Sequence, residues 1–140
     1  MTTAIDSNVI VALWAMDPTV ASAAQVALDV ILEEGSLVIA APVFAELLAA
    51  PSRNPALLDS FCAESGIRVD WDLAEAVWRA AGVAYRAYAS RRRRHGNDGP
   101  RRILTDFVIG AHANENGYRL LTLDERLYRA AFPSLRILRV

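Results

Sequence analysis

Residues 3–11, TAIDSNVIV, decide the fold: a short apolar segment ends in Asp6 and a second apolar segment begins directly after it. The first segment, residues 2–5, predicts a buried strand, and the second, residues 7–16, predicts a helix. In a parallel sheet covered by helices, functional groups gather just outside the carboxyl ends of the strands. Asp6 is expected at such an end, so the rest of the chain must supply partners for its carboxylate.

The same alternation of strand and helix continues along the chain. Further strands are predicted at residues 37–40, 67–70, 118–122 and 136–140. Further helices are predicted at residues 18–34, 42–50, 55–65, 73–94, 103–116 and 124–132. This alternation predicts an α/β fold with a largely parallel sheet that carries helices on both faces.

Local signals mark the helix boundaries. Asp17 and Asn54 each precede a proline and are predicted N-caps. Asp72, three residues before Glu75, predicts a capping box on the longest helix. The segment HGNDGP, residues 95–100, is rich in turn formers and predicts an exposed loop.

The composition is typical of a globular protein, with 54% hydrophobic and 22% charged residues, and residues 1–140 fit a single domain. No apolar run is long enough to span a bilayer, and the first residues lack the pattern of a signal peptide, which predicts a cytoplasmic protein.

The one cysteine, Cys62, cannot form an internal disulfide and is expected in the core. All fifteen basic residues are arginines, and the absence of lysine excludes Schiff-base chemistry and a P-loop lysine.

Three other acidic residues occupy places comparable to that of Asp6. Asp124 follows a predicted strand, Asp106 lies in the first turn of a predicted helix, and Glu46 lies in the first turns of the helix after the second strand. If the four carboxylates converge, each pair at ~4 Å repels by a few kcal/mol, and either protons or a divalent cation must offset this repulsion. Oxygen ligands suit Mg²⁺ or Mn²⁺, whereas Zn²⁺ prefers the His and Cys that are scarce here. A cation held by carboxylates commonly serves the hydrolysis of phosphodiesters.

Each carboxylate also has an ordinary structural interpretation. Asp6 and Asp124 can act as helix N-caps, and Asp106 can complement a helix dipole. Glu46 can be a solvated surface residue. The joint placement of the four in their flanking segments favours the catalytic interpretation.

These flanking segments resemble those of PIN-domain ribonucleases, and more narrowly those of the VapC toxins of bacterial toxin–antitoxin pairs. The matching segments, in the right order over nearly the whole chain, are AIDSNVIVAL, APVFAELLA, RILTDFVIGAHA and LLTLDERLYRAAFPSLRIL. The resemblance implies an α/β/α sandwich with a parallel sheet of four or five strands. It also implies an endoribonuclease that depends on Mg²⁺ or Mn²⁺ and cuts single-stranded or loop RNA.

The resemblance carries over residue by residue. It implies a catalytic and metal-binding set, which is Asp6, Glu46, Asp106 and Asp124. It implies a polar set that hydrogen-bonds these carboxylates or metal-bound water, which is Ser7, Asn8 and Thr122. Water is then the expected nucleophile, which gives 5′-phosphate and 3′-hydroxyl ends. The implied partners are a VapB-like antitoxin that masks the acidic site and a second copy of the chain in a homodimer.

Positive charge is concentrated in the second half of the chain. Residues 1–75 carry a net charge of −9 and residues 76–140 a net charge of +8. The segment RRRRHGNDGPRR contributes six arginines: Arg91, Arg92, Arg93, Arg94, Arg101 and Arg102. Guanidinium groups neutralise phosphates and stack on unpaired bases, which predicts contact with RNA. Alternatively, the arginines only complement the dipole at the end of a helix.

Two residues near the predicted site have less defined roles. Glu125 adjoins Asp124 and is a candidate for a further ligand, although successive residues at a helix start point in different directions. His112 lies about 120° around the helix from Asp106 and is expected to pack in the core or to form an interhelical hydrogen bond.

Two other functions compete with the nuclease interpretation. A phosphatase of the haloacid-dehalogenase type also begins with a strand that ends in an aspartate, but it requires a second aspartate where this chain has Asn8 and a lysine that this chain lacks. A PIN-like module that binds RNA or protein without cutting is the stronger alternative. Degenerate modules are expected to lose some acidic residues, whereas all four are present here.

Overall fold

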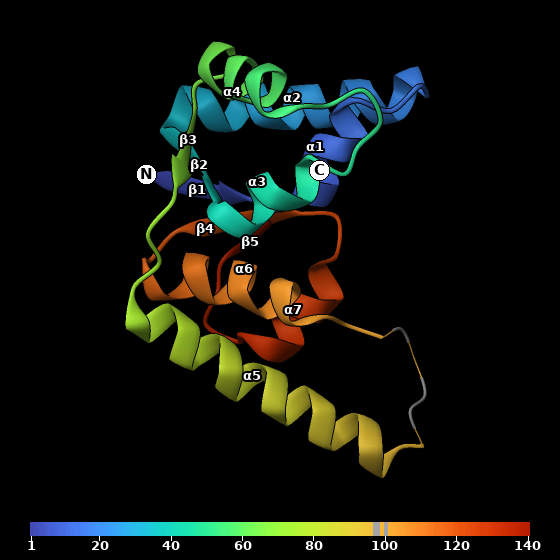
Figure 1. Cartoon of the computed structure of the whole chain (residues 1–140), viewed down its shortest axis with the longest axis vertical. Helices are drawn as coiled ribbons and strands as arrows, with labels where there is room; N and C mark the ends of the chain where they lie inside the picture. Colours follow the sequence, from blue (N-terminus) through green and yellow to red (C-terminus); the bar gives the residue numbers. More distant parts are fainter. Residues whose placement is uncertain (97–98, 100) are drawn as a thin grey trace.

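Five short strands form one sheet in which every pair of neighbours runs parallel, in the order β3-β2-β1-β4-β5 (Figure 1). The computed structural model describes residues 1–96, 99 and 101–140. The strands are β1 (Thr2–Ile5), β2 (Ser36–Ala40), β3 (Ile67–Asp70), β4 (Arg119–Thr122) and β5 (Ile137–Arg139). Central β1 pairs with both β2 and β4, so that Ala4 lies opposite Val38 on one side and Leu120 on the other. The predicted parallel sheet is confirmed, with five strands.

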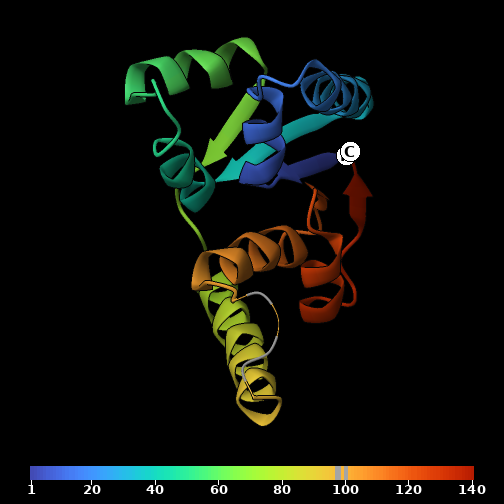
Figure 2. The ribbon, with the colours of Figure 1, turned by 90° about the vertical axis from the view of Figure 1, so that its right-hand side faces the viewer.

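Seven helices connect and cover these strands. They are α1 (Ser7–Leu13), α2 (Pro18–Glu34), α3 (Ala41–Leu47), α4 (Pro55–Glu64), α5 (Glu75–Arg94), α6 (Leu104–Glu115) and α7 (Glu125–Ala131). Helices α1, α2 and α4 lie on one side of the sheet, and α6 and α7 lie on the other (Figure 1). Helix α5 packs along α6 and extends away from the sheet (Figure 2). The α/β/α sandwich is therefore confirmed.

Local chemistry sets the starts of α2 and α4. The Asp17 side chain accepts a hydrogen bond from the Thr19 backbone N–H at 2.9 Å, and the Asn54 side chain accepts one from the Leu57 N–H at 2.9 Å. Both residues are therefore N-caps as predicted, each followed by a proline at the first helical position. The predicted capping box at Asp72 is wrong. Helix α5 begins only at Glu75, because Ala74 before it has extended backbone angles.

Two helices end earlier than predicted. Helix α1 ends at Leu13 and not at residue 16, and α3 ends at Leu47 and not at residue 50. The predicted loop at residues 95–100 is only partly covered, because positions 97, 98 and 100 lie outside the described residues.

The core fills both sides of the sheet. Its largest fully buried side chains include Tyr128 and Phe107, and Cys62 is buried as predicted. Gly110 of α6 allows α7 to approach closely, because a Cβ at this position would overlap the ring of Phe132 and come within 3.0 Å of Cδ1 of Tyr128. This close approach fixes the position of Tyr128 next to the end of β1.

In the described part of the chain, no helix is both long enough and apolar enough to cross a membrane.

Candidate active site

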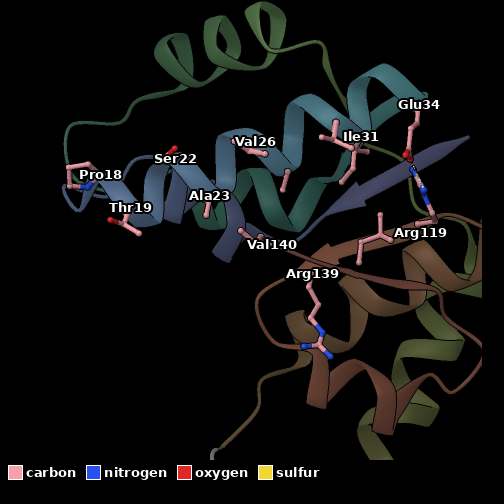
Figure 3. A pocket seen from close by; sticks show the side chains of 13 residues that line it. Pro18, Thr19, Ser22, Ala23, Val26, Ile31, Glu34, Arg119, Arg139 and Val140 are labelled. Atoms are coloured by element: carbon pink, nitrogen blue, oxygen red, sulfur yellow. Dashed lines mark ion pairs between the residues drawn. The ribbon is translucent and has the colours of Figure 1, made fainter.

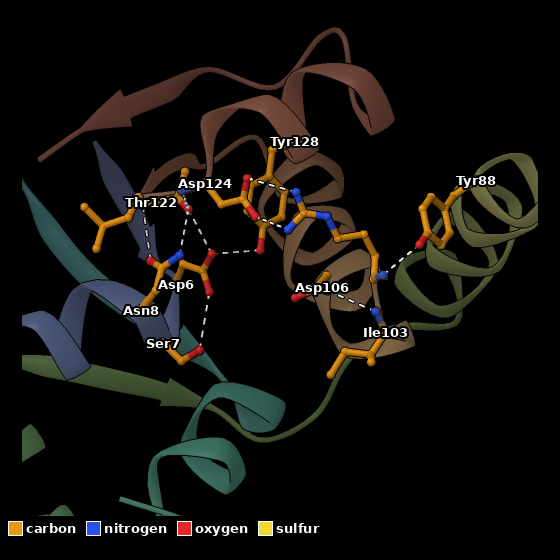
Figure 4. Close-up of polar contacts among 11 residues, drawn as sticks. Asp6, Ser7, Asn8, Tyr88, Ile103, Asp106, Thr122, Asp124 and Tyr128 are labelled. Carbon is orange, nitrogen blue, oxygen red and sulfur yellow. Dashed lines mark hydrogen bonds and ion pairs between the residues drawn. The ribbon is translucent and has the colours of Figure 1, made fainter. Parts of the chain in front are cut away.

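Asp6 is a buried carboxylate at the carboxyl end of the central strand. Its side chain is at the edge of the sheet and is 5% exposed. Its Oδ2 accepts hydrogen bonds from Thr122 Oγ1 and from the Tyr128 hydroxyl, each at 2.9 Å (Figure 4). Burial raises the pKa of Asp6 above its ordinary value, although these two hydrogen bonds act in the opposite direction. The charged form of Asp6 is thus costly, and a positive charge nearby favours it.

Glu46 reaches the same place from α3. Ser7 Oγ lies 3.2 Å from Glu46 Oε1 and 3.4 Å from Asp6 Oδ1. A hydroxyl has one proton, so Ser7 donates to one of these carboxylates at a time and ties the two together. Burial raises the pKa of Glu46, and the charges of Asp6 and Asp106 raise it further.

Asp106 is the third residue of α6. Its Oδ2 accepts a hydrogen bond from the Ile103 backbone N–H at 3.1 Å, which stabilises the start of α6. Its charge also contributes to the raised pKa of both Asp6 and Glu46. Asp106 therefore combines a structural contact with a position in electrostatic reach of the other two carboxylates.

Asp124 stands at the N-cap of α7, two residues after β4. Its backbone N–H donates to Thr122 Oγ1 at 2.9 Å, and its carboxylate forms an ion pair with the guanidinium of Arg102. The Arg102 backbone N–H in turn donates to the Tyr88 hydroxyl at 2.7 Å (Figure 4). The contact between Arg102 and Asp124 was not anticipated from the sequence, which placed Arg102 only among RNA-binding residues.

Of the predicted polar residues, Ser7 and Thr122 contact carboxylates, whereas Asn8 contacts Thr122 and the Leu123 N–H. Thr122 donates to Asp6 and accepts from the Asp124 N–H. Asn8 lies beside Thr122, with Nδ2 3.5 Å from its Oγ1, and Asn8 Oδ1 accepts from the Leu123 N–H at 3.2 Å. A chain of hydrogen bonds thus joins the ends of β1 and β4 and holds Asp6 and Asp124 next to each other.

Tyr128 is the residue of this site that sequence reasoning missed. It is fully buried, and burial together with the negative charge of Asp6 raises its pKa, so that its hydroxyl keeps the proton it donates to Asp6. Its spacing of four residues from Asp124, one helical turn, is a signal that it lies on the same side of α7.

Two other candidates lie away from the carboxylates. Glu125 forms ion pairs with Arg129 and Arg139. Buried His112 has its Nε2 2.8 Å from Asp70 Oδ2 at the end of β3, so it packs in the core as expected, but its partner belongs to a strand and not to a helix.

Three of the six predicted RNA-binding arginines line the same hollow as Asp124. Arg91, Arg92 and Arg102 line a hollow of ≈ 470 Å³ between α5 and α7, and Asp124 lines the same hollow. A larger hollow of ≈ 1020 Å³ lies between α2 and β5, and its apolar wall includes Val26 and Ile31 (Figure 3). This larger hollow contains none of the four carboxylates and is a separate feature of the surface.

We call the region around Asp6, Glu46, Asp106 and Asp124 the acidic edge. Its side chains offer carboxylates and hydroxyls, which fit a hard cation such as Mg²⁺ or Mn²⁺. In the described part of the chain, the four carboxylates do not surround a common point. Within residues 1–96, 99 and 101–140, no three His, Cys, Asp or Glu side chains form a group that could hold a metal ion as they stand. Asp124 is turned towards Arg102, and Asp106 is turned towards the Ile103 N–H.

Several solved structures have the same fold. VapBC2 from Rickettsia felis bound to a DNA fragment from its promoter has a TM-score of 0.65 and 18% identity, over 99% of this chain and 98% of that chain. VapBC-1 from nontypeable Haemophilus influenzae has a TM-score of 0.67 and 18% identity, over 99% and 98% of the two chains. FitAcB from Neisseria gonorrhoeae has a TM-score of 0.64 and 21% identity, over 96% and 95%.

Sequence comparison narrows this likeness to a family. No curated protein sequence matches the chain significantly. The family model described as PIN domain does match, over residues 3–133, which include all four carboxylates and the polar residues that contact them. This chain therefore belongs to the PIN domain family.

Proposed function

We propose that this chain is a metal-dependent endoribonuclease and the toxin of a VapBC-type toxin–antitoxin pair, formed as one PIN-like domain and acting in the cytoplasm. One observation carries the proposal. Asp6 and Glu46, from different segments, share the hydroxyl of Ser7 and have raised pKa values to which the charge of Asp106 contributes. A folded protein keeps such mutually repelling carboxylates at one edge only at a cost, which a bound dication offsets.

In this proposal, Asp6, Glu46, Asp106 and Asp124 would hold Mg²⁺ or Mn²⁺, which would supply an activated water and neutralise charge in the hydrolysis of a phosphodiester. Thr122 and Tyr128 orient Asp6, Ser7 orients Glu46, and Asn8 supports Thr122 through their contact. Ligation by Asp124 requires it to turn away from Arg102. The RNA products carry 5′-phosphate and 3′-hydroxyl ends.

The arginines of residues 91–102 bind the substrate in this proposal. We assign RNA phosphates to Arg91, Arg92, Arg93, Arg94, Arg101 and Arg102. Dipole complementarity at the end of α5 needs one or two cations, whereas four arginines fill its last turn. Arg91, Arg92 and Arg102 border the hollow that also contains Asp124, which supports a path for RNA to the carboxylates.

The proposed protein partners follow from the resemblance to VapC toxins and from the fold shared with chains of VapBC complexes. A VapB-like antitoxin is expected to mask the acidic edge with a basic side chain. A homodimer of the toxin is the expected assembly.

The experiment that tests the function combines cleavage with metal binding. The purified chain is incubated with end-labelled RNA with and without Mn²⁺, and Mn²⁺ binding is titrated in parallel. Asp106→Asn is expected to abolish both cleavage and high-affinity Mn²⁺ binding. Glu115→Gln, which also converts an acid to an amide on α6 but at its exposed end, is the matched control and should retain both. Products with 2′,3′-cyclic phosphate ends would contradict the water mechanism.

One observation favours a second candidate, a PIN-like module that binds RNA or protein without cutting. Arg102 already neutralises Asp124, and the described side chains do not form a ready metal group. The same titration separates the two candidates, because a non-catalytic module should bind Mn²⁺ no better than its Asp106→Asn variant.

A further inference from the structure

The hollow between α5 and α7 has an apolar floor and a cationic rim. Phe107, Leu127 and Ala131 contribute the apolar floor, and Arg91, Arg92 and Arg126 contribute positive charge. At ≈ 470 Å³, the hollow is in the size range of small-molecule sites, which is about 300–1,000 Å³. Its chemistry suits a ligand with one flat apolar part and one anionic part.

The hollow and the acidic edge have Asp124 in common. Arg102 and Asp124 line it and form an ion pair with each other. The main chain of Arg102 is held in place by the hydrogen bond from its N–H to the Tyr88 hydroxyl. A ligand in the hollow is therefore held directly next to the proposed cleavage site.

A second hollow continues the positive surface in the other direction. It has a volume of ≈ 450 Å³, shares Tyr88, Arg92 and Arg102 with the first, and adds Arg93 and Arg101. Together the two hollows form a basic track that ends at Asp124, which favours a polyanion that passes along it. An acidic peptide shares the charge but has no flat, uncharged ring in each repeat to place on the apolar floor.

We propose that the hollow between α5 and α7 is the subsite for one unpaired nucleotide of an RNA strand, adjacent to the phosphate that is cut. The base lies on the apolar floor, and the flanking phosphates contact Arg91 and Arg92. Paired bases are stacked inside a helix and are not available to such a pocket, so the subsite selects single-stranded RNA. This inference rests on the proposed nuclease function for the position of the cut, but not for the binding of the nucleotide.

The test measures binding of two fluorescent strands in chelator, in the Asp106→Asn background so that neither is cut. One strand is a short oligouridylate, and the other has the same ribose-phosphate backbone without bases. Ala130→Leu fills the hollow from an exposed position of α7, and Ala76→Leu is the matched control on α5. Ala130→Leu is expected to weaken oligouridylate binding by about tenfold, the range of one stacked base, and to leave the abasic strand unchanged.

A second pair of variants tests the phosphate contacts. Arg92→Gln should weaken binding of both strands and reduce the slope of log K against log salt by about 0.7, the value for one phosphate contact on a single strand. Arg86→Gln, an exposed arginine of the same helix that lines neither hollow, should leave the slope unchanged.

Each result decides a separate point. If Ala130→Leu matches Ala76→Leu on both strands, the hollow holds no base and the inference is wrong. If these variants weaken binding of a cognate protein partner but not of RNA, the hollow is a protein site and the inference is also wrong. If RNA binding changes as expected but the wild-type chain neither cuts RNA nor binds Mn²⁺, the subsite stands and only the nuclease function fails.

Discussion

The guanidinium of Arg102 forks onto the carboxylate of Asp124, with Nη1 facing Oδ2 and Nη2 3.4 Å from Oδ1. The two side chains are 23% and 29% exposed, so the pair is largely shielded from water. This guanidinium supplies positive charge beside Asp124. In the proposed metal site, Arg102 and the ion would therefore compete for Asp124.

Removing Arg102 is expected to strengthen metal binding in the absence of RNA. Arg102→Ala should raise Mn²⁺ affinity by about 3- to 10-fold, since partly exposed bidentate ion pairs contribute on the order of 1 kcal/mol. Calorimetric or paramagnetic titration with Mn²⁺ measures this change. Arg101→Ala, its exposed neighbour, is the control and should change the affinity less. A weaker Mn²⁺ affinity in Arg102→Ala would show that the arginine supports the metal site and does not compete with it.

Asp6→Asn is expected to stabilise the metal-free protein while it removes cleavage. The amide is neutral, so it avoids the cost of burying a charge, and its oxygen can still accept from Thr122 and Tyr128. Urea unfolding in chelator should show a higher free energy of unfolding for Asp6→Asn than for the wild type at neutral pH. A less stable variant would mean that the charge of Asp6 is satisfied by the protein alone.

The pH dependence of stability follows from the same carboxylates. The pKa of Asp6 is raised from 3.8 and that of Glu46 from 4.5, so the native protein holds these protons more tightly than the unfolded chain. Their contribution to stability is present in full below the unfolded pKa values and is lost as pH rises through the native ones. The advantage of Asp6→Asn over wild type should therefore grow as pH increases from about 4 to about 7. Saturating Mn²⁺ should reverse the order of the two proteins at neutral pH, because the proposed metal site is complete only in the wild type.

Much of the fold could be predicted from local signals. The N-caps Asp17 and Asn54 act through hydrogen bonds to residues two and three positions away, so the sequence contains all the partners that they need. Helices α1 and α3 were predicted too long because apolar periodicity continues past Leu13 and Leu47, where the helices end.

The contacts within the candidate site were predictable only where the positions of the strands determine them. Asp6 and Thr122 end neighbouring parallel strands, so their meeting follows from the topology. The role of Tyr128 depends on how closely α7 approaches α6, and Arg102 contacts Asp124 across twenty-two residues of chain. Such contacts depend on tertiary packing, and neither periodicity nor spacing indicates them.

Tyr128→Phe removes one hydrogen-bond donor from Asp6 and keeps the ring in the core. The lost bond is expected to lower the free energy of unfolding by about 1 kcal/mol and to raise the pKa of Asp6 further. Because protons then compete better with the metal, Mn²⁺ affinity should fall more at acidic than at neutral pH. Tyr85→Phe is the control, since Tyr85 packs against Phe107 on the same side of the sheet. Equal behaviour of the two variants would remove Tyr128 from the site.

Gly110→Ala tests whether close packing of α7 on α6 positions Tyr128. Helix propensity favours alanine by about 1 kcal/mol, but a Cβ here overlaps the buried ring of Phe132, and overpacking costs about 1–3 kcal/mol. Gly110→Ala should therefore unfold at lower temperature and cut RNA more slowly. Gly82→Ala is the matched control, because a Cβ at Gly82 meets nothing within 4 Å, and it should stabilise exposed α5 by up to about 1 kcal/mol without changing cleavage. Replacing Phe132 by leucine in the Gly110→Ala background should relieve the overlap and recover part of both losses; if cleavage stays low while stability recovers, the position of Tyr128 does not control activity.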